Sequence, residues 1–197
     1  GDNGSDGPLG DTYGYFSSAP LRGKKGTCYE GGMRVPFIAS WAKAGKANPF
    51  NIARNHLHHE QIGTVMDIYA TILETAGVKN PSDHVVDGVS LLKQFLGKRN
   101  PDRANHFMCH FPHSHRSSYF TTFRQGDWKL IYRYKGKTKY ELYNLGEDPF
   151  ETKNLAESEP NKLKTMTEAM AVRLEKEGAL YPSTGDTVLK PDIPSSN

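Results

Sequence analysis

The first residues of the chain have the composition of a cation-binding loop. The opening segment, GDNGSDGPLG, offers carboxylate and amide oxygens, which are the ligands that hard cations such as calcium prefer. Its glycines also let the backbone turn tightly around an ion. The segment is not an EF-hand, because Tyr13 stands where that motif needs a bidentate Glu. A cation-binding loop and a flexible polar turn therefore both stay open for this segment.

A second segment has the composition of an anion-binding loop. Residues 20–37, PLRGKKGTCYEGGMRVPF, are dense in glycine and in basic side chains. Such a loop presents backbone amides and positive charge to a bound anion. The segment therefore predicts an oxyanion-binding loop, with a tetrahedral anion as its ligand.

A third segment, HFMCHFPHSHR, brings His106, His110, His113 and His115 close together. This crowding invites a zinc hypothesis, because imidazole is a common zinc ligand. Pro112 would break any helix that aligned the four side chains, however, and no HExxH motif is present. The spacing therefore argues against a zinc site.

Charge and composition bear on the possible partners. The formal net charge is +3, from 25 basic and 22 acidic residues without a block of like charges, so charge does not indicate nucleic acid. The sequence has no apolar run of the roughly 18 residues that a membrane span needs, and its first residues do not show the basic-then-apolar pattern of a signal peptide. Cys28 and Cys109 match no zinc spacing, and one disulfide or two free thiols are equally open.

Three segments predict the elements of an α/β region. Residues 35–42, VPFIASWA, form a continuous apolar run, which is typical of a strand buried on both faces of a mostly parallel sheet. Apolar residues recur at helical spacing between Glu60 and Gly77, and glycine is a typical residue at a helix C-terminus. A shorter helix is predicted over residues 88–98, GVSLLKQFLGK.

A β-rich region follows. The runs SSYFTTFR, DWKLIYRY and KYELYNL, joined by turn-like residues, predict an antiparallel meander. In the second run, Trp128, Leu130, Tyr132 and Tyr134 point one way, and Lys129, Ile131 and Arg133 point the other. RNA-binding sheets also mix aromatic and basic residues. A helix predicted over residues 159–177 offers its apolar side to these aromatic residues. Core packing is therefore favoured over base stacking.

The predicted fold class is α/β, followed by an α+β subdomain. Residues 1–103 are expected to form the C-terminal part of a large α/β domain, and residues 104–197 an antiparallel sheet with a packed C-terminal helix. A strand buried on both faces needs neighbours, which the first region does not supply. We therefore expect further strands to cover residues 35–42 and the inner face of the 60–77 helix, and an isolated chain to self-associate.

Residues 20–37, with the DNG sequence upstream, closely resemble the type I sulfatases of the alkaline-phosphatase-like superfamily. Later segments are similar to the C-terminal half of that family in the same order: MDIYATILETAGV, VDGVSLL, FRQGDWKLIY and ELYNLGEDPFETKNLA. The resemblance runs from residue 2 to about residue 180. It implies the C-terminal portion of an alkaline-phosphatase-like sulfatase fold, and an enzyme that hydrolyses sulfate esters.

The resemblance implies roles for particular residues. Asp2 and Asn3 would bind one active-site calcium ion, and Lys25, rather than Lys24, would contact the sulfate. The chain departs from the family at Cys28, where a second Thr is usual, so a neighbouring hydrogen bond is expected to differ.

The resemblance also extends to the histidine-rich segment. His-x-Pro-His segments occur in carbohydrate-type sulfatases, which makes His110 and His113 candidates for substrate contact. Structural packing of these histidines is an equally open alternative.

The family's nucleophile is a formylglycine made from Cys or Ser in a C/S-x-P-x-R motif. Ser18-Ala-Pro-Leu-Arg22 fits that formula, but it overlaps the lysine loop, has Leu where the family has a small residue, and lacks the downstream Thr-Gly. We therefore expect the formylglycine, the paired metal aspartates and the catalytic Lys and His to lie in an N-terminal half that precedes this sequence. The chain alone is expected to be inactive.

Two other functions stay open. One is an alkaline-phosphatase-like phosphohydrolase, although GKKGTCYEGG argues against it, and the other is a non-catalytic binding module derived from a sulfatase. The resemblance implies a sulfated carbohydrate or an aryl sulfate as substrate and a calcium ion shared with the N-terminal half. It also implies a periplasmic, secreted or lysosomal location.

Overall fold

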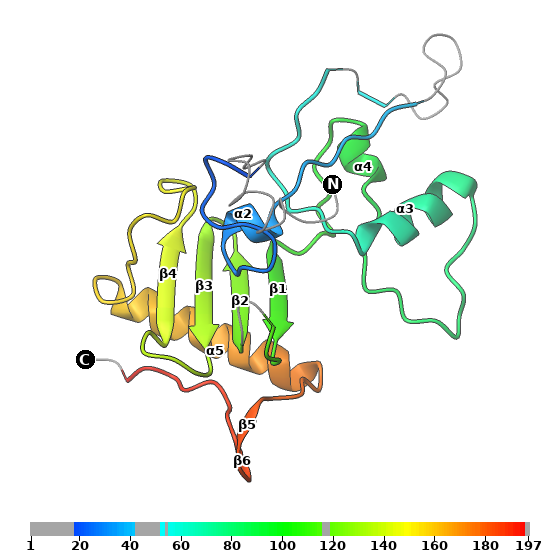
Figure 1. Ribbon diagram of the computed structural model, residues 1–197. Coiled ribbons are helices and arrows are strands. Elements are labelled where there is room, and N and C mark those ends of the chain that lie inside the picture. Colours follow the sequence, from blue (N-terminus) through cyan, green and yellow to red (C-terminus); the bar gives the residue numbers. More distant parts are fainter. Residues whose placement is uncertain (1–17, 42–51, 54, 116–118, 196–197) are drawn as a thin grey trace. The chain divides into compact units, whose positions relative to one another are not determined.

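The computed structural model describes residues 18–41, 52–53, 55–115 and 119–195 (Figure 1). Its helices and strands are, in chain order, α2 (Glu30–Met33), α3 (Asp67–Ala76), α4 (Leu92–Phe95), β1 (His106–Phe111), β2 (Phe120–Gln125), β3 (Trp128–Arg133), β4 (Tyr140–Asn144), α5 (Pro160–Lys176), β5 (Ser183–Thr184) and β6 (Thr187–Val188). The chain divides into two compact units, residues 1–37 with 106–197 and residues 38–105. No helix in the described ranges is long and apolar enough to cross a bilayer.

Strands β1 to β4 form an antiparallel sheet in which each strand pairs with the next one along the chain. Phe123 of β2 lies opposite Leu130 of β3, which in turn lies opposite Leu142 of β4. The meander predicted for β2, β3 and β4 is therefore confirmed. The sheet also contains strand β1, which was not predicted. The histidines of HFMCHF interrupt the alternation of apolar and polar residues by which a strand is predicted.

One face of the sheet packs on helix α5, which lies across it in Figure 1. The strands contribute Phe123, Leu130 and Leu142, none of them more than 4% exposed. The helix contributes a buried row of apolar side chains: Leu163, Met166, Met170 and Leu174. This burial removes apolar surface from water and is the main stabilising contribution to the unit. The predicted core packing between the aromatic side of β3 and the last helix is confirmed.

The opposite face of the sheet carries a smaller apolar cluster together with buried charged side chains. Ile131 and Tyr143 pack there with Cys28. Helix α2 and the segment before it lie over this face (Figure 1). Because neighbouring residues of a strand point to opposite faces, Lys129 and Arg133 are directed to this side while Leu130 enters the core. The side chains of strand β3 therefore lie in two different environments, one on each face of the sheet.

Helices α3 and α4 belong to the 38–105 unit. They confirm the helices predicted over residues 60–77 and 88–98, within narrower bounds. Helix α3 begins at Asp67, whose buried carboxylate pairs with Arg103 Nη1 at 2.9 Å. It ends at Gly77, whose φ of 69° lets the backbone turn out of the helix.

The strand predicted over residues 35–42 is wrong for the residues that the structure describes. Residues 35–41 form no strand, and Ile38 is 89% exposed. A strand needs a hydrogen-bonded neighbour. The described strands pair only among themselves, as the four-stranded sheet and the β5–β6 hairpin. The apolar composition of residues 35–42 indicates that the segment is suited to burial, but it does not identify a neighbouring strand to pair with.

Helix α3 presents apolar side chains to the surface of its unit. Ile72 is 59% exposed and Tyr69 is 43% exposed, whereas the residues buried by the helix are Asp67, Ala70 and Thr71. The apolar stripe predicted for this helix is thus present but is not covered by the described residues of the unit. Exposed apolar patches of this kind favour association.

Truncation of Met170 should destabilise the unit built from the sheet and α5. The Met170 side chain is fully buried, so Met170→Ala should lower the free energy of unfolding by about 2–5 kcal/mol through lost contacts and a cavity. Val172 on the same helix is 70% exposed, and Val172→Ala should change that free energy by less than about 0.5 kcal/mol. Chemical denaturation followed by circular dichroism measures both variants. Equal losses would contradict the burial assigned to Met170.

The exposed stripe of α3 should cause the chain to self-associate. Ile72→Glu places a charge in the middle of the stripe and should shift the population toward monomer, because burying an unpaired charge in an interface is unfavourable. Glu74→Gln on the same helix is the matched control, since Glu74 is exposed and carries no apolar surface of this stripe. Sedimentation velocity measures the distribution. A chain that is already monomeric at high concentration would refute the prediction.

Candidate functional site

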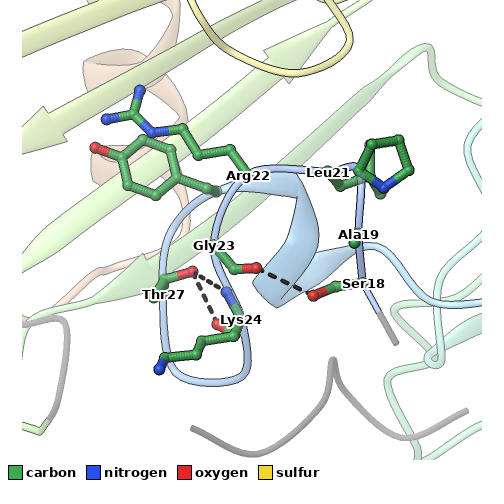
Figure 2. A pocket seen from close by; sticks show the side chains of 9 residues that line it. Ser18, Ala19, Leu21, Arg22, Gly23, Lys24 and Thr27 are labelled. Atoms are coloured by element: carbon green, nitrogen blue, oxygen red, sulfur yellow. Dashed lines mark hydrogen bonds between the residues drawn. The ribbon is translucent and has the colours of Figure 1, made fainter. Parts of the chain in front are cut away.

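The candidate site is the segment of residues 18–29 that precedes α2, named here the anion loop. At its tip, the Thr27 N–H and hydroxyl both donate to the Lys24 carbonyl oxygen, at 3.0 and 2.8 Å. The Lys24 N–H donates to Thr27 Oγ1 at 3.2 Å, so the two residues are joined in both directions (Figure 2). Lys25 and Gly26 between them are therefore held on a closed turn.

Helix α2 lies close against the anion loop because two glycines leave room for it. A Cβ on Gly31 would collide with the carbonyl oxygens of Arg22 and Gly23, and one on Gly32 would collide with the Thr27 carbonyl oxygen. The Gly31 N–H donates to the Arg22 carbonyl oxygen at 2.7 Å. The EGG sequence is thus a requirement of close backbone packing.

Arg22 attaches the anion loop to the sheet. Its Nη1 donates to the Tyr143 hydroxyl at 3.0 Å and to the Glu151 carbonyl oxygen at 2.8 Å. Its guanidinium carbon also lies 3.9 Å from the centre of the Tyr29 ring, a cation–π contact. A planar guanidinium can combine hydrogen bonds with stacking on a ring, which a lysine ammonium cannot do.

A buried carboxylate, Glu141 of β4, organises the groups around Arg22. It accepts hydrogen bonds from the Tyr143 hydroxyl at 2.7 Å, the Tyr29 hydroxyl at 2.9 Å and Arg133 Nε at 2.9 Å. Burial alone would raise the pKa of this carboxyl, but the hydrogen bonds from Tyr143, Arg133 and Tyr29 outweigh it and hold the pKa below its ordinary value. Glu141 is therefore ionised at neutral pH and is a fixed acceptor.

The two tyrosines of this network stay protonated. Burial, together with the hydrogen bond to Glu141, raises the pKa of Tyr29 to about 12. The same causes raise the pKa of Tyr143 above its ordinary value. Both phenols therefore act as hydrogen-bond donors rather than as bases. The network around Arg22 holds the loop in place and does not itself move protons.

A cavity of about 420 Å³ opens beside the anion loop, within the range of small-molecule sites. Its walls are residues 18–24, Thr27 and Tyr29 (Figure 2). At one wall the Ser18 hydroxyl donates to the Gly23 carbonyl oxygen at 3.1 Å. Ser18 therefore contributes to closing the loop. The cationic side chains among the residues that line the cavity are Arg22 and Lys24.

The two adjacent lysines take different places on the turn. Lys24 lines the cavity, whereas Lys25 is half-buried on the turn and is not among the lining residues. Contact between Lys25 and sulfate stays a prediction. Asp2 and Asn3 lie outside the described residues. Within the described ranges, no group of three or more His, Cys, Asp or Glu side chains could hold a metal ion.

His110 and His113 have different surroundings. The His110 ring is engaged at both nitrogens, with Nδ1 2.7 Å from Thr121 Oγ1 and Nε2 2.7 Å from the Leu180 carbonyl oxygen. His113 is exposed just after β1, with its ring centre 5.0 Å from that of Phe111. The structure thus accounts for His110 within the subdomain. Substrate contact by either histidine stays a prediction.

Both cysteines are free thiols. Cys28 is fully buried, and its Sγ accepts a hydrogen bond from Arg133 Nη2 at 3.2 Å. Burial raises the pKa of the Cys109 thiol above its ordinary value. The expected departure at position 28 therefore places a sulfur, which is a weak acceptor, beside a guanidinium.

Sequence reasoning does not single out Lys129, Arg133 or Glu141, although all three support the anion loop. A signal for them exists in the alternation of β3. Its basic residues stand on one side of a strand whose other side is core. If a second layer covers the basic side, each cation is buried and requires an acidic partner. What the sequence does not reveal is that the anion loop is this second layer.

The comparisons with known proteins agree with this architecture. The profile of the family described as N-sulphoglucosamine sulphohydrolase, C-terminal, matches residues 23–179. A sulfatase of Formosa agariphila is 35% identical over 163 residues, which is 78% of this chain and 28% of that protein. Human N-acetylgalactosamine-6-sulfatase is 29% identical over 189 residues, which is 85% of this chain and 35% of that enzyme. The chain thus spans 28% and 35% of the lengths of these two relatives.

A solved structure supports the fold. A Bacteroides thetaiotaomicron VPI-5482 protein assigned as a sulfatase superposes with a TM-score of 0.50 at 20% identity, over 66% of this chain and 30% of that one. At this identity the likeness shows the fold alone. The family match is the more specific finding, because it begins inside the anion loop and ends just beyond α5. The chain therefore belongs to the N-sulphoglucosamine sulphohydrolase C-terminal family of the sulfatases.

Proposed function

We propose that this chain forms the C-terminal part of a sulfatase and holds the sulfate group of the substrate. The observation that carries the proposal is the closed turn from Lys24 to Thr27, which holds Lys24 on the wall of a cavity and Lys25 on the turn beside it. Arg22 attaches the same loop to the sheet. A cationic loop held this firmly suits the binding of a tetrahedral oxyanion.

The proposed role of Lys25 is to stabilise negative charge on the sulfate oxygens. Hydrolysis of a sulfate ester increases the charge on the sulfate and on the leaving oxygen in the transition state. An ammonium that is already in place stabilises this charge without reorganisation, which makes it more effective than a mobile one. The turn that contains Lys25 is closed by Thr27 and is therefore suited to this role. Lys24, on the cavity wall, is proposed to contribute less directly.

The complete enzyme is proposed to contain a calcium ion and a formylglycine. This chain would supply only part of the calcium site and not the formylglycine. Asp2 and Asn3 would bind calcium together with ligands from the N-terminal half, since two residues supply fewer than the six to eight oxygens that calcium takes. When bound, calcium supplies positive charge against the sulfate, and formylglycine supplies the nucleophile. The residues of this chain bind and orient the anion.

A sulfated carbohydrate is the proposed substrate class. Several relatives carry the name N-acetylgalactosamine-6-sulfatase, among them the mouse, dog and human proteins. We propose His113 and His110 as substrate contacts, with His113 the more accessible of the two. A phosphohydrolase is the less supported alternative, because the relatives reported above are sulfatases.

The whole protein is proposed to contain two halves. The N-terminal half of the sulfatase is the proposed partner of residues 1–103, and residues 104–197 are the proposed C-terminal subdomain. A periplasmic, secreted or lysosomal location is proposed from the family resemblance. A non-catalytic binding module remains the alternative function, and activity measurements distinguish it from the enzyme.

The lysines provide the sharpest test. In the enzyme reassembled from this chain and its N-terminal half, matured to formylglycine, Lys25→Ala should lower the turnover of an aryl sulfate at least about a hundredfold, as expected when one charge-stabilising donor is lost. Lys24→Ala removes the same charge from the adjacent position and is the matched control, with a much smaller expected loss. The chain alone should show no turnover, because binding residues without a nucleophile leave the barrier high.

Each arm of this assay has an outcome that contradicts the proposal. Equal activity of the two lysine variants would show that the register of the sulfate contact is wrong. Turnover by the chain alone that disappears in Ser18→Ala would place the nucleophile in the anion loop. A reassembled pair without any sulfatase activity would favour the binding module.

A further inference from the structure

Three buried charged side chains meet between the anion loop and the sheet. Glu30 comes from the start of α2, Lys129 from β3 and Glu151 from the segment after β4. They are 6%, 1% and 0% exposed, respectively. Lysine and glutamate are rarely buried to this extent unless they are paired. We name these three residues the buried ion cluster.

The cluster is closely bonded. Lys129 Nζ lies 2.9 Å from Glu30 Oε1 and 2.8 Å from Glu151 Oε1. The backbone N–H of Glu30 donates to the other oxygen of the Glu151 carboxylate, at 2.7 Å. Arg124 Nη1 approaches Glu30 Oε2 at 3.7 Å from the edge of the cluster. Two carboxylates thus face one ammonium and one guanidinium, so the charges balance.

Glu151 connects the cluster directly to the anion loop. Its side chain accepts from the Glu30 N–H, while its backbone carbonyl oxygen accepts from Arg22 Nη1 at 2.8 Å. The residue adopts a φ of 55°, a left-handed conformation that is uncommon for a residue with a side chain. A conformation of this kind persists where surrounding contacts determine it. Glu151 therefore joins both ends of the segment from Arg22 to Glu30.

Net stability does not account for the cluster. Removing charges from water is costly, and replacing a buried ion group by apolar residues of similar size is often neutral or stabilising. What this ion cluster supplies that an apolar contact does not is a defined position, since the Lys129 ammonium must lie between the two carboxylates and Glu151 Oε2 must accept from the Glu30 N–H. Removal of Lys129 alone would leave two carboxylates close together without their ammonium, and their repulsion would push α2 away from the sheet.

We infer that Lys129 is a positioning residue for sulfate recognition, which it performs by fixing Glu30 and Glu151 and thereby the anion loop that carries Lys25. Glu30 is followed by Gly31 and Gly32, whose close packing transmits the position of α2 to the carbonyl groups of the loop. The inference rests on the proposed function, because it assigns the loop to a bound sulfate. Lys129 itself touches no substrate in this mechanism.

The test compares Lys129→Met with Lys137→Met in the reassembled enzyme. Methionine keeps the approximate length of lysine and removes the charge, and Lys137 is an exposed lysine between β3 and β4. In Lys129→Met, the inhibition constant for inorganic sulfate should rise at least about tenfold, a loss of about 1.4 kcal/mol in binding. Amide hydrogen exchange should increase in residues 22–34 but not in α5. Lys137→Met should change neither quantity.

The inhibition constant separates positioning from stability. If Lys129 only stabilised the fold, Lys129→Met would reduce the amount of active enzyme but leave the inhibition constant of the folded fraction unchanged. That result would overturn the inference, as would unchanged hydrogen exchange in residues 22–34. Should Lys129→Met fail to fold, Lys129→Arg and Glu30→Gln replace it in the same assay. We expect both variants to increase the inhibition constant for inorganic sulfate. An unchanged inhibition constant would overturn the inference.

Failure of the proposed function gives a different pattern. In that case inorganic sulfate would not inhibit the wild-type enzyme, and Lys25→Ala would retain full turnover. The positioning role of Lys129 in sulfate recognition would then be refuted as well. Increased exchange in residues 22–34 of Lys129→Met would nevertheless show that the buried ion cluster anchors the loop.

Discussion

The ammonium of Lys129, enclosed by the carboxylates of Glu30 and Glu151, is the contact on which the site depends. It brings together a helix, a strand and a connecting segment on the face of the sheet that carries the smaller of the two apolar clusters. The same strand sends Leu130 into the large apolar cluster beneath α5. Because alternate residues of β3 point to the two sides of the sheet, this strand contacts both the core and the residues that hold the anion loop.

A second network complements the first at the other end of the loop. Arg22 is held by the Tyr143 hydroxyl, the Tyr29 ring and the Glu151 carbonyl oxygen, while Glu141 accepts from the surrounding phenols. Hydrogen bonds from Tyr143, Arg133 and Tyr29 outweigh burial and hold the pKa of Glu141 low, whereas burial and the hydrogen bond to Glu141 raise the pKa of Tyr29. Side-chain charge thus holds the loop, and the glycines permit its close approach to α2.

Elements with a local periodic signal could be predicted from the sequence. Helix α5 and strands β2 to β4 show their buried faces in the spacing of their own apolar residues. The strand expected over residues 35–42 failed because apolar composition says that a segment is suited to burial but not which strand pairs with it. The family motif points to Lys25 as a sulfate contact, which stays a prediction. The sequence could not identify Lys129, because its partners come from distant parts of the chain.

The anchors of the anion loop are far from it along the chain. Glu30 and Lys129 are 99 residues apart, and Arg22 and the Glu151 carbonyl that it reaches are 129 residues apart. Closing such long stretches of chain costs conformational entropy, and folds rich in distant contacts form slowly. During synthesis the loop emerges from the ribosome well before its anchors are made. A chain with an incomplete C-terminal sheet would therefore lack the contacts that hold the anion loop.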